Sequence, residues 1–181
     1  MIARLFHAWE RQLANVTTDR VVREFDWGLD WIDSNASSAS AQDSLREWST
    51  NIMVDTDQFF YTPPTEQYQL RGSILTFPSH FQTPHPENNT VHARYFPAAQ
   101  GDRHRRAVVV LPQRNADPDG HMALSRLISR LGISSLRLSL PYHDQRMPPE
   151  LHRADYIVSP NLGRTLQVCR QAVLDTRRSV H

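Results

Sequence analysis

The sequence predicts an α/β protein: a three-layer sandwich with N-terminal helices and a mixed sheet, in which antiparallel lead-in strands are followed by a βαβα unit. Apolar residues at helical spacing within residues 1–33 predict the helices. Two strand-like stretches, residues 68–79 and 89–98, flank a turn-rich segment, which is typical of an antiparallel pair. From residue 105 onward the pattern is strand, helix, strand, helix, which implies parallel strands joined by a right-handed crossover.

The pattern of the N-terminal part predicts two amphipathic helices, or one broken helix, followed by a linker. The apolar positions of the first helix are Ile2, Leu5, Phe6, Trp9 and Leu13. Those of the second are Val21, Val22, Phe25, Leu29 and Ile32. The small polar stretch "SNASSASAQDS", residues 34–44, is typical of a linker. We therefore expect two parts: residues 1–60 as a helical segment with its linker, and residues 61–181 as an α/β domain.

Each element of the βαβα unit has its own signal. The near-continuous apolar run "RRAVVVLP", residues 105–112, predicts a strand covered on both faces. A helix is expected to start at Asp117-Pro118 and to end before Gly132, and residues 133–141 form the second strand. A last helix is expected to start at Ser159-Pro160 and to pack an apolar stripe against the sheet. The two helical stripes are Leu124, Leu127, Ile128 and Leu131, and then Leu162, Leu166, Cys169 and Val173.

The composition argues against several function classes. A formal net charge of +1 among 181 residues argues against broad nucleic-acid binding. Every basic residue except histidine is arginine, so neither a P-loop lysine nor a Schiff-base lysine is present. The glycines form no G-x-G-x-x-G, and the histidines have no metal-ligand spacing, so we expect no cofactor and no metal. Charged residues interrupt the N-terminal apolar positions, so we expect no membrane span and a cytoplasmic protein.

The chemistry is expected in the loops that follow the two parallel strands, because ligands of open α/β sheets bind beyond the carboxyl ends of the strands. The first loop, Pro112 to His121, has backbone N–H groups that could stabilise a developing negative charge. The second loop, Pro141 to Asn161, is rich in His, Asp, Arg and Tyr. Adjacent residues seldom act as a catalytic pair, so the second loop is more typical of a pocket wall. The pocket-loop candidates are Asn115, Tyr142, His143, Asp144 and Arg146.

The stretch "AVVVLPQRNADPDGHMALSRLISRLGISSLRLSLPYHDQRMPPE" resembles the N-terminal half of an α/β-hydrolase. More narrowly, it is similar to bacterial relatives of abhydrolase domain-containing protein 18, and the resemblance covers about residues 68–181. It implies that the loop after the first parallel strand supplies one oxyanion-hole N–H, from Gln113 or Arg114. The usual His-Gly start of that loop is replaced by Pro112-Gln113. The resemblance also implies a further strand with Gly-x-Ser-x-Gly, then an acid and a histidine.

No serine of this chain has glycines two residues before and after it; Ser134 has only Gly132. The resemblance therefore implies an incomplete α/β-hydrolase-like domain. It would be the N-terminal portion of a serine esterase or lipase that acts on a small ester-like substrate and is inactive alone. The alternative is a non-catalytic α/β protein that completes its sheet by association with a partner or with itself through an open sheet edge.

Overall fold

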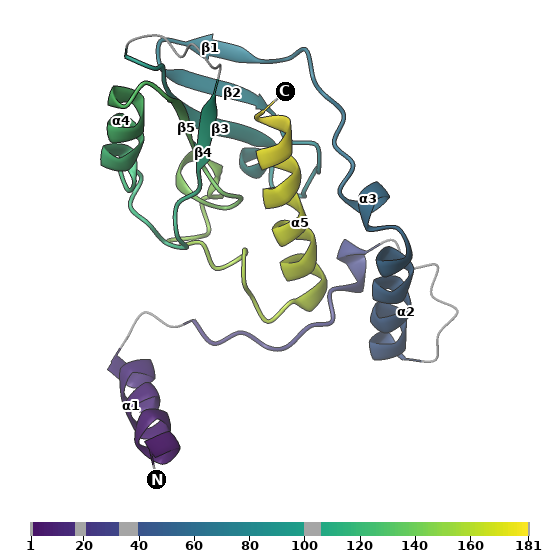
Figure 1. Ribbon diagram of the computed structural model, residues 1–181. Coiled ribbons are helices and arrows are strands. Elements are labelled where there is room, and N and C mark those ends of the chain that lie inside the picture. Colours follow the sequence, from purple (N-terminus) through teal and green to yellow (C-terminus); the bar gives the residue numbers. More distant parts are fainter. Residues whose placement is uncertain (1, 17–20, 33–39, 100–105, 181) are drawn as a thin grey trace.

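The computed structural model describes residues 2–16, 21–32, 40–99 and 106–180 (Figure 1). Its α-helices are α1 (Ile2–Val16), α2 (Ala41–Val54), α3 (Thr56–Phe59), α4 (Met122–Arg130) and α5 (Leu162–Arg178). Its strands are β1 (Gln69–Arg71), β2 (Ile74–Pro78), β3 (Thr90–Phe96), β4 (Ala107–Val110) and β5 (Ser134–Leu138). They form one sheet in the order β1-β2-β3-β5-β4, in which only β4 and β5 are parallel. The α/β class and the antiparallel lead-in are thereby confirmed, but the single strand expected over residues 68–79 is a hairpin of β1 and β2, because the chain turns at Gly72, which has a left-handed φ of 61°.

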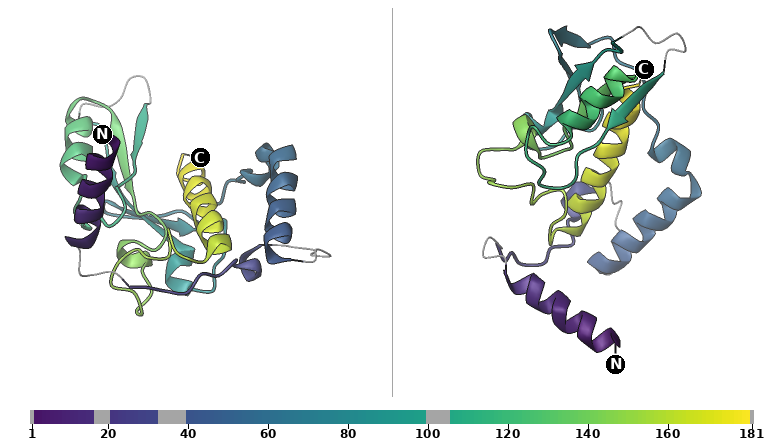
Figure 2. Two further views of the ribbon diagram at one scale, coloured as in Figure 1. Left: turned by 90° about the horizontal axis from the view of Figure 1, so that it is seen from below. Right: turned by 60° about the vertical axis from the view of Figure 1, so that its left-hand side comes forward.

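The helices α4 and α5 cover opposite faces of this sheet (Figure 2). On the α4 side, Ser135 of β5 donates a hydrogen bond to the carbonyl of Ser125, at 3.0 Å. The other face carries an apolar cluster made of Phe77, Val91, Ala93, Leu136 and Leu138. Tyr68 packs on this cluster and donates its hydroxyl to the carbonyl of Arg178 in α5, at 2.5 Å. The alternation of polar and apolar residues along β5 therefore separates the two helical layers.

The prediction of a second N-terminal helix is wrong. Residues 21–28 contain no helix, and residues 29–31 form only a single 3₁₀ turn. This segment instead lies along the start of α5, where the N–H of Asp26 donates to Pro160 O and the N–H of Gly163 donates to Trp27 O. The predicted linker overlaps the start of α2. Ser40 caps this helix by accepting the N–H of Asp43 at 3.2 Å. Residues 33–39 of that linker lie outside the described residues.

Both helices of the βαβα unit begin later than predicted. Asp117 and Gly120 close a separate turn, with the Gly120 N–H donating to Asp117 O at 2.7 Å, and α4 begins at Met122 after a left-handed His121. The Ser159-Pro160 pair likewise precedes the true cap of α5. That cap is Asn161, whose side chain accepts the N–H of Arg164 at 2.7 Å.

Three apolar surfaces are exposed in the described part of the chain, and two of them, on β4 and on α5, were predicted to be covered. The strand β4 lies at the end of the sheet, with Val108 38% exposed, so it is not covered on both faces. Leu127 of α4 and Leu131, directly after this helix, point to solvent, whereas Ser125 faces the sheet. On α5 the exposed stripe contains Leu166 and Val173. The buried positions of α5 are mostly polar: Gly163, Gln167, Val168, Gln171, Leu174, Asp175 and Arg178.

The close contact between residues 26–28 and α5 predicts the effect of a single methyl group. A Cβ added at Gly163 would lie 2.0 Å from Gly28 O, which is a backbone atom that cannot move alone. Helix propensity by itself predicts that Gly163→Ala stabilises the protein by up to about 1 kcal/mol. We expect instead a net destabilisation of roughly 1–3 kcal/mol. It is measured by thermal unfolding, together with faster proteolysis within residues 21–32.

The control is Gly72→Ala in the β1–β2 turn. A Cβ there has no neighbour within 4 Å, so only the left-handed φ of 61° opposes it, at a cost of about 1–2 kcal/mol. Residues 21–32 should stay resistant to protease in that variant. A Gly163→Ala protein that is as stable as the unmodified chain and equally resistant would show that the segment does not pack on α5.

Candidate functional site

The best candidate site lies where the loops after β4 and β5 separate. The loop after β4 leads to α4 on one face of the sheet, and the loop after β5 leads to α5 on the other (Figure 2). Such a divergence opens a crevice at the carboxyl ends of the two strands, where ligands of α/β proteins bind. A cavity of about 460 Å³ occupies this position. It is lined by Asn115, Ala116, Asp117, Pro118, His143, Asp144, Met147, His152, Arg153 and Ala154.

His143 fixes the wall of this cavity rather than offering a free base. Its side chain is 2% exposed, and its Nδ1 lies 2.9 Å from Pro141 O. Its Nε2 accepts the backbone N–H of Asn115 at 3.2 Å. Because a carbonyl oxygen can only accept, Nδ1 carries the proton, Nε2 is the acceptor, and the ring is neutral. Burial, the largest cause, lowers the pKa of His143, which agrees with this assignment.

Asn115 extends the connection to a second part of the loop after β5. The residue has a left-handed φ of 57°, and its Oδ1 accepts the N–H of Ala154 at 2.9 Å. His143 and Asn115 thus join the loop after β4 to two parts of the loop after β5. Asn115, His143 and Ala154 all line the cavity, so these two hydrogen bonds fix its wall.

The neutral state of His143 predicts how stability depends on pH. The unfolded chain protonates this histidine near its ordinary pKa of 6.5, whereas the folded protein does so only at a lower pH. Below about pH 6.5 the unfolded state therefore binds more protons, and stability falls as the pH falls, by at most about 1.4 kcal/mol per pH unit for one group. We expect the fall in Tm between about pH 7.5 and about pH 5.5 to be smaller in His143→Gln, as followed by thermal unfolding.

Two other histidines set the background for this measurement. Burial also lowers the pKa of His80 and His92, so part of the pH dependence should remain in the variant. If the Tm of His143→Gln fell with pH as steeply as that of the unmodified protein, the assignment of a neutral, buried His143 would be contradicted.

Asp144 is paired with a buried cation and not with His143. Its carboxylate accepts the hydroxyl of Ser139 at 2.6 Å and forms an ion pair with Arg137, and the Arg137 side chain is 3% exposed. Arg137 also donates to the carbonyls of Gly120 and Asp117, at 3.3 and 3.4 Å. The pair therefore holds the turn before α4 against β5. Asp144 borders both the 460 Å³ cavity and a second cavity, of about 300 Å³, above β2 and β3.

Tyr142 points away from the cavity into the protein. It is fully buried, with a left-handed φ of 60°, and its hydroxyl lies 2.9 Å from His85 Nδ1. His85 Nε2 lies 3.3 Å from a carboxylate oxygen of Glu150. Burial raises the pKa of Tyr142. The ring packs edge-on against Tyr156, at 5.3 Å between centroids, so Tyr142 supports the second loop from behind.

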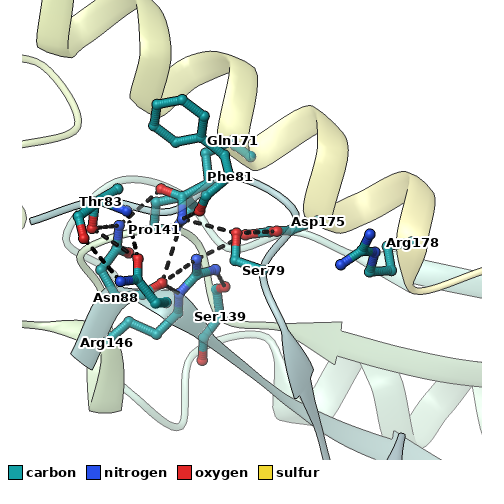
Figure 3. A network of polar contacts seen from close by, with 12 residues as sticks. Ser79, Phe81, Thr83, Asn88, Ser139, Pro141, Arg146, Gln171, Asp175 and Arg178 are labelled. Atoms are coloured by element: carbon teal, nitrogen blue, oxygen red, sulfur yellow. Dashed lines mark hydrogen bonds and ion pairs between the residues drawn. The ribbon is translucent and has the colours of Figure 1, made fainter. Parts of the chain in front are cut away.

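Arg146 lies at the centre of a buried polar network that is also outside the cavity (Figure 3). Its guanidinium is 0% exposed and binds Asp175 of α5 at 2.7 Å. It also donates to Asn88 O at 2.8 Å and to Ser139 O at 3.0 Å. Gln171 extends the network by accepting from the Asn88 side chain at 2.8 Å. Arg146 therefore fastens α5 to the loops beneath the site and does not reach a ligand there.

Gln113 and Arg114, the predicted oxyanion-hole donors, are both exposed at the rim of the first loop. In the described part of the chain, neither backbone N–H donates a hydrogen bond, whereas the N–H of Asn115 is taken by His143. The Arg114 side chain lies 3.7 Å from Asp155. Among the described residues, these two backbone N–H groups therefore have no hydrogen-bond acceptor, and neither residue lines the 460 Å³ cavity.

The cavity also contains residues that were not among the pocket-loop candidates. Met147, His152 and Arg153 come from a stretch without periodicity, and only their position in the long second loop could have indicated them. Among the described residues, no group of three or more His, Cys, Asp or Glu side chains is placed to hold a metal ion. No helix in the described ranges is long and apolar enough to cross a membrane.

Comparison with known proteins adds no assignment: no family model matches the chain, and no curated protein matches it either.

Proposed function

We propose that this chain is the N-terminal portion of a serine hydrolase of the α/β-hydrolase type, which cleaves an ester-like bond in a small molecule. The observation that carries the proposal is the pair of backbone N–H groups of Gln113 and Arg114, which donate no hydrogen bond among the described residues. They lie in the loop after β4, directly before the cavity residue Asn115. Backbone N–H groups held by a fixed loop are the donors that stabilise a tetrahedral oxyanion. The described part of the loop has such a fixed anchor, because His143 holds Asn115 beside them.

The topology supports a nucleophile beside this loop. Parallel crossovers are nearly always right-handed, and two crossovers of one hand on opposite faces of a sheet run in opposite directions across it. The crossover through α4 runs from the edge strand β4 inward to β5. A crossover through α5 on the other face would then run outward, to the free edge of β4. A parallel strand placed there would end beside Gln113 and Arg114.

The residues of this chain would then position the substrate and stabilise the oxyanion. They would not attack the substrate themselves. The sequence contains no Gly-x-Ser-x-Gly, so a serine at the end of the added strand would be the nucleophile. The 460 Å³ cavity would receive part of the substrate. The chain alone is expected to hydrolyse no ester and to react with no serine-directed fluorophosphonate probe.

The test begins with the DNA that follows the codon for His181. A reading frame that encodes a strand and Gly-x-Ser-x-Gly should be expressed together with this chain as one polypeptide. We expect that polypeptide to hydrolyse a p-nitrophenyl ester and to be labelled by the fluorophosphonate at the serine of its Gly-x-Ser-x-Gly motif. Labelling of the chain alone, or a continuous frame with no such motif, would refute the proposal.

The free edge of β4 favours a second candidate function, a non-catalytic protein that completes its sheet by association. Val108 and Leu111 are 38% and 46% exposed beside this edge, and Leu127 of α4 is 53% exposed. An exposed apolar edge strand is a template for pairing with another strand. If this candidate is correct, Val108→Lys should convert an oligomer to a monomer in light scattering after size exclusion. Lysine at the exposed Thr90 of β3, an inner strand, is the control that should leave the oligomer unchanged.

A further inference from the structure

The second cavity, of about 300 Å³, lies on the α4 side of the sheet. It is lined by Thr76 of β2, by His92 of β3 and by Met122, the first residue of α4. The two strand residues alternate with core residues, because their neighbours Phe77 and Val91 belong to the apolar cluster on the other face. Thr76 and His92 are also direct partners in the antiparallel pairing of the two strands. Their side chains therefore stand side by side on the floor of the cavity.

This cavity carries polar groups that have no protein partner. Among the described residues, the Thr76 hydroxyl, the His92 ring and the side-chain amide of Gln145 make no hydrogen bond. Burial, the largest cause, lowers the pKa of His92, so its ring is neutral near neutral pH and has one donor and one acceptor. An apolar ligand would cover these groups without bonding to them, which is unfavourable. The cavity therefore favours a polar ligand.

Asp144 adds a buried acceptor to the lining. Its side chain is 3% exposed, and its Oδ2 accepts from the Ser139 hydroxyl at 2.6 Å and from Arg137. Its Oδ1 accepts no hydrogen bond among the described residues. Both oxygens of a carboxylate can accept, so Oδ1 is available to a donor on a ligand. A ligand that reaches Asp144 must therefore donate there, and it must also match the donors and acceptors of the floor.

The charges around this cavity cancel. Inside it, Arg137 and Asp144 form the ion pair described above, and each side chain is 3% exposed. At its edge, the exposed side chains of Arg94 and Asp119 carry one charge of each sign. An ionic ligand would leave water without finding an uncompensated opposite charge in the lining, which is costly. The cavity therefore favours an uncharged ligand.

We propose that this cavity binds an uncharged polyol of the size of a monosaccharide. A hydroxyl group both donates and accepts, so a ring with several hydroxyls can bond to Thr76, His92 and Asp144 together. Its C–H groups would lie against Ile74 and Met122. Among the described residues, no Phe, Tyr or Trp lines the cavity, so a flat nucleobase would have no stacking partner. The volume lies at the lower end of small-molecule sites, which suits one sugar ring.

Titration of the whole chain with neutral polyols tests this inference, which does not depend on the proposed hydrolase. The probes are glucose, mannose, galactose and myo-inositol, and binding is followed by NMR of protein that carries isotope-labelled histidine. The signal of His92 is the one that is missing in His92→Gln. We expect at least one probe to shift this signal in a saturable way. The signal of His80, which is bonded to Arg178 of α5, should not change. Glucuronate and glucosamine, which carry charges, should bind at least fivefold more weakly than the best neutral probe.

Two variants each remove one polar group from the cavity. Thr76→Val replaces a hydroxyl with a methyl group of similar size, and Gln145→Ala shortens an exposed side chain. Each should raise the dissociation constant of the best probe at least fivefold, with the Tm of the protein nearly unchanged. Thr90→Val is the matched control, because Thr90 lies on β3 like His92 but lines neither of the two cavities. It should leave the dissociation constant unchanged.

Three results would overturn the inference. The first is that no neutral probe shifts the His92 signal. The second is that glucuronate or glucosamine binds at least as tightly as the best neutral probe, because the cavity would then offer an uncompensated charge. The third is that Thr76→Val and Thr90→Val have equal dissociation constants, because the probe would then bind elsewhere on the protein.

Discussion

Replacing Asp175 with alanine is expected to lower the free energy of unfolding by about 3–5 kcal/mol, the range found when one partner of a buried ion pair is removed. Asp175 and Arg146 are both 0% exposed, and their charged groups lie 2.7 Å apart. Without the carboxylate, the Arg146 guanidinium stays buried with only carbonyl partners. Burial already lowers the pKa of Arg146, and the carboxylate opposes that shift.

The effect should be large because one carboxylate joins three parts of the fold. Asp175 lies on α5, Arg146 lies in the loop after β5, and Ser79 follows β2 and donates its hydroxyl to Asp175 at 2.7 Å. Gln171, one turn earlier on α5, donates to the same Ser79 hydroxyl at 3.0 Å. Losing Asp175 therefore weakens the attachment of α5 to the sheet, and not a single contact only (Figure 3).

Thermal unfolding measures the loss, and a fall in Tm of roughly 6–20 °C corresponds to this range for a domain of this size. Asp43→Ala is the matched control, because its ion pair with Arg46 is more than half exposed and should contribute less than about 1 kcal/mol. A double variant with Arg146→Met and Asp175→Leu should recover much of the loss, since an apolar pair can replace a buried ion pair. Equal effects of Asp175→Ala and Asp43→Ala would show that the buried pair does not hold α5.

The helix α5 shows what periodicity can and cannot predict. The stripe containing Leu166 and Val173 correctly predicted a helix, and it predicted the wrong buried face. The face that the structure buries carries Gln171, Asp175 and Arg178. Polar residues can be buried when each has a partner, and those partners lie far away in the sequence. Asn88 is 83 residues from Gln171, so no local pattern could reveal the network.

The helix α4 has the same reversal for a simpler reason. Ser125, and not its leucines, faces the sheet, because β5 presents the small polar side chain of Ser135 to it. The presence of strands followed from local signals, but the single strand predicted over residues 68–79 is the hairpin of β1 and β2, and the spatial order of the strands was not predicted. The side of a helix that meets the sheet depends instead on which residues the strand presents.

The position of the candidate site could be predicted from the sequence, but the directions of its side chains could not. Its place beyond the parallel strands follows from topology alone, and Asn115, His143 and Asp144 do line the cavity there. Tyr142 and Arg146 come from the same loop, yet they point into the interior. The backbone is left-handed at Tyr142 and Asp144, so successive side chains of this loop point in different directions. The sequence pattern did not predict a left-handed backbone at these two positions. The sequence therefore identified the loop, and only the backbone conformation separates its cavity residues from its supporting ones.

Proline substitution in the first loop should reveal the oxyanion donor in the completed hydrolase proposed above. Proline has no N–H, so Gln113→Pro and Arg114→Pro each remove one of the two unused donors. We expect one of them to lower kcat by roughly 100- to 1,000-fold, which is about 2.7–4 kcal/mol of lost transition-state stabilisation. KM should change little, because the donor acts on charge that develops only in the transition state.

Gln113→Ala and Arg114→Ala are the matched controls, because they remove the side chains and keep the N–H groups. Both side chains are exposed, and Arg114 contacts only Asp155, at 3.7 Å, among the described residues, so the alanine variants should keep kcat within a few-fold. Fluorophosphonate labelling of the serine in the Gly-x-Ser-x-Gly motif should be slower in the same proline variant that loses kcat, since the phosphonyl oxygen occupies the oxyanion position. If the alanine variants lose as much kcat as the proline variants, the side chains rather than the backbone donors act on the substrate. If neither proline variant loses kcat, the oxyanion is stabilised elsewhere, and the two N–H groups have another role.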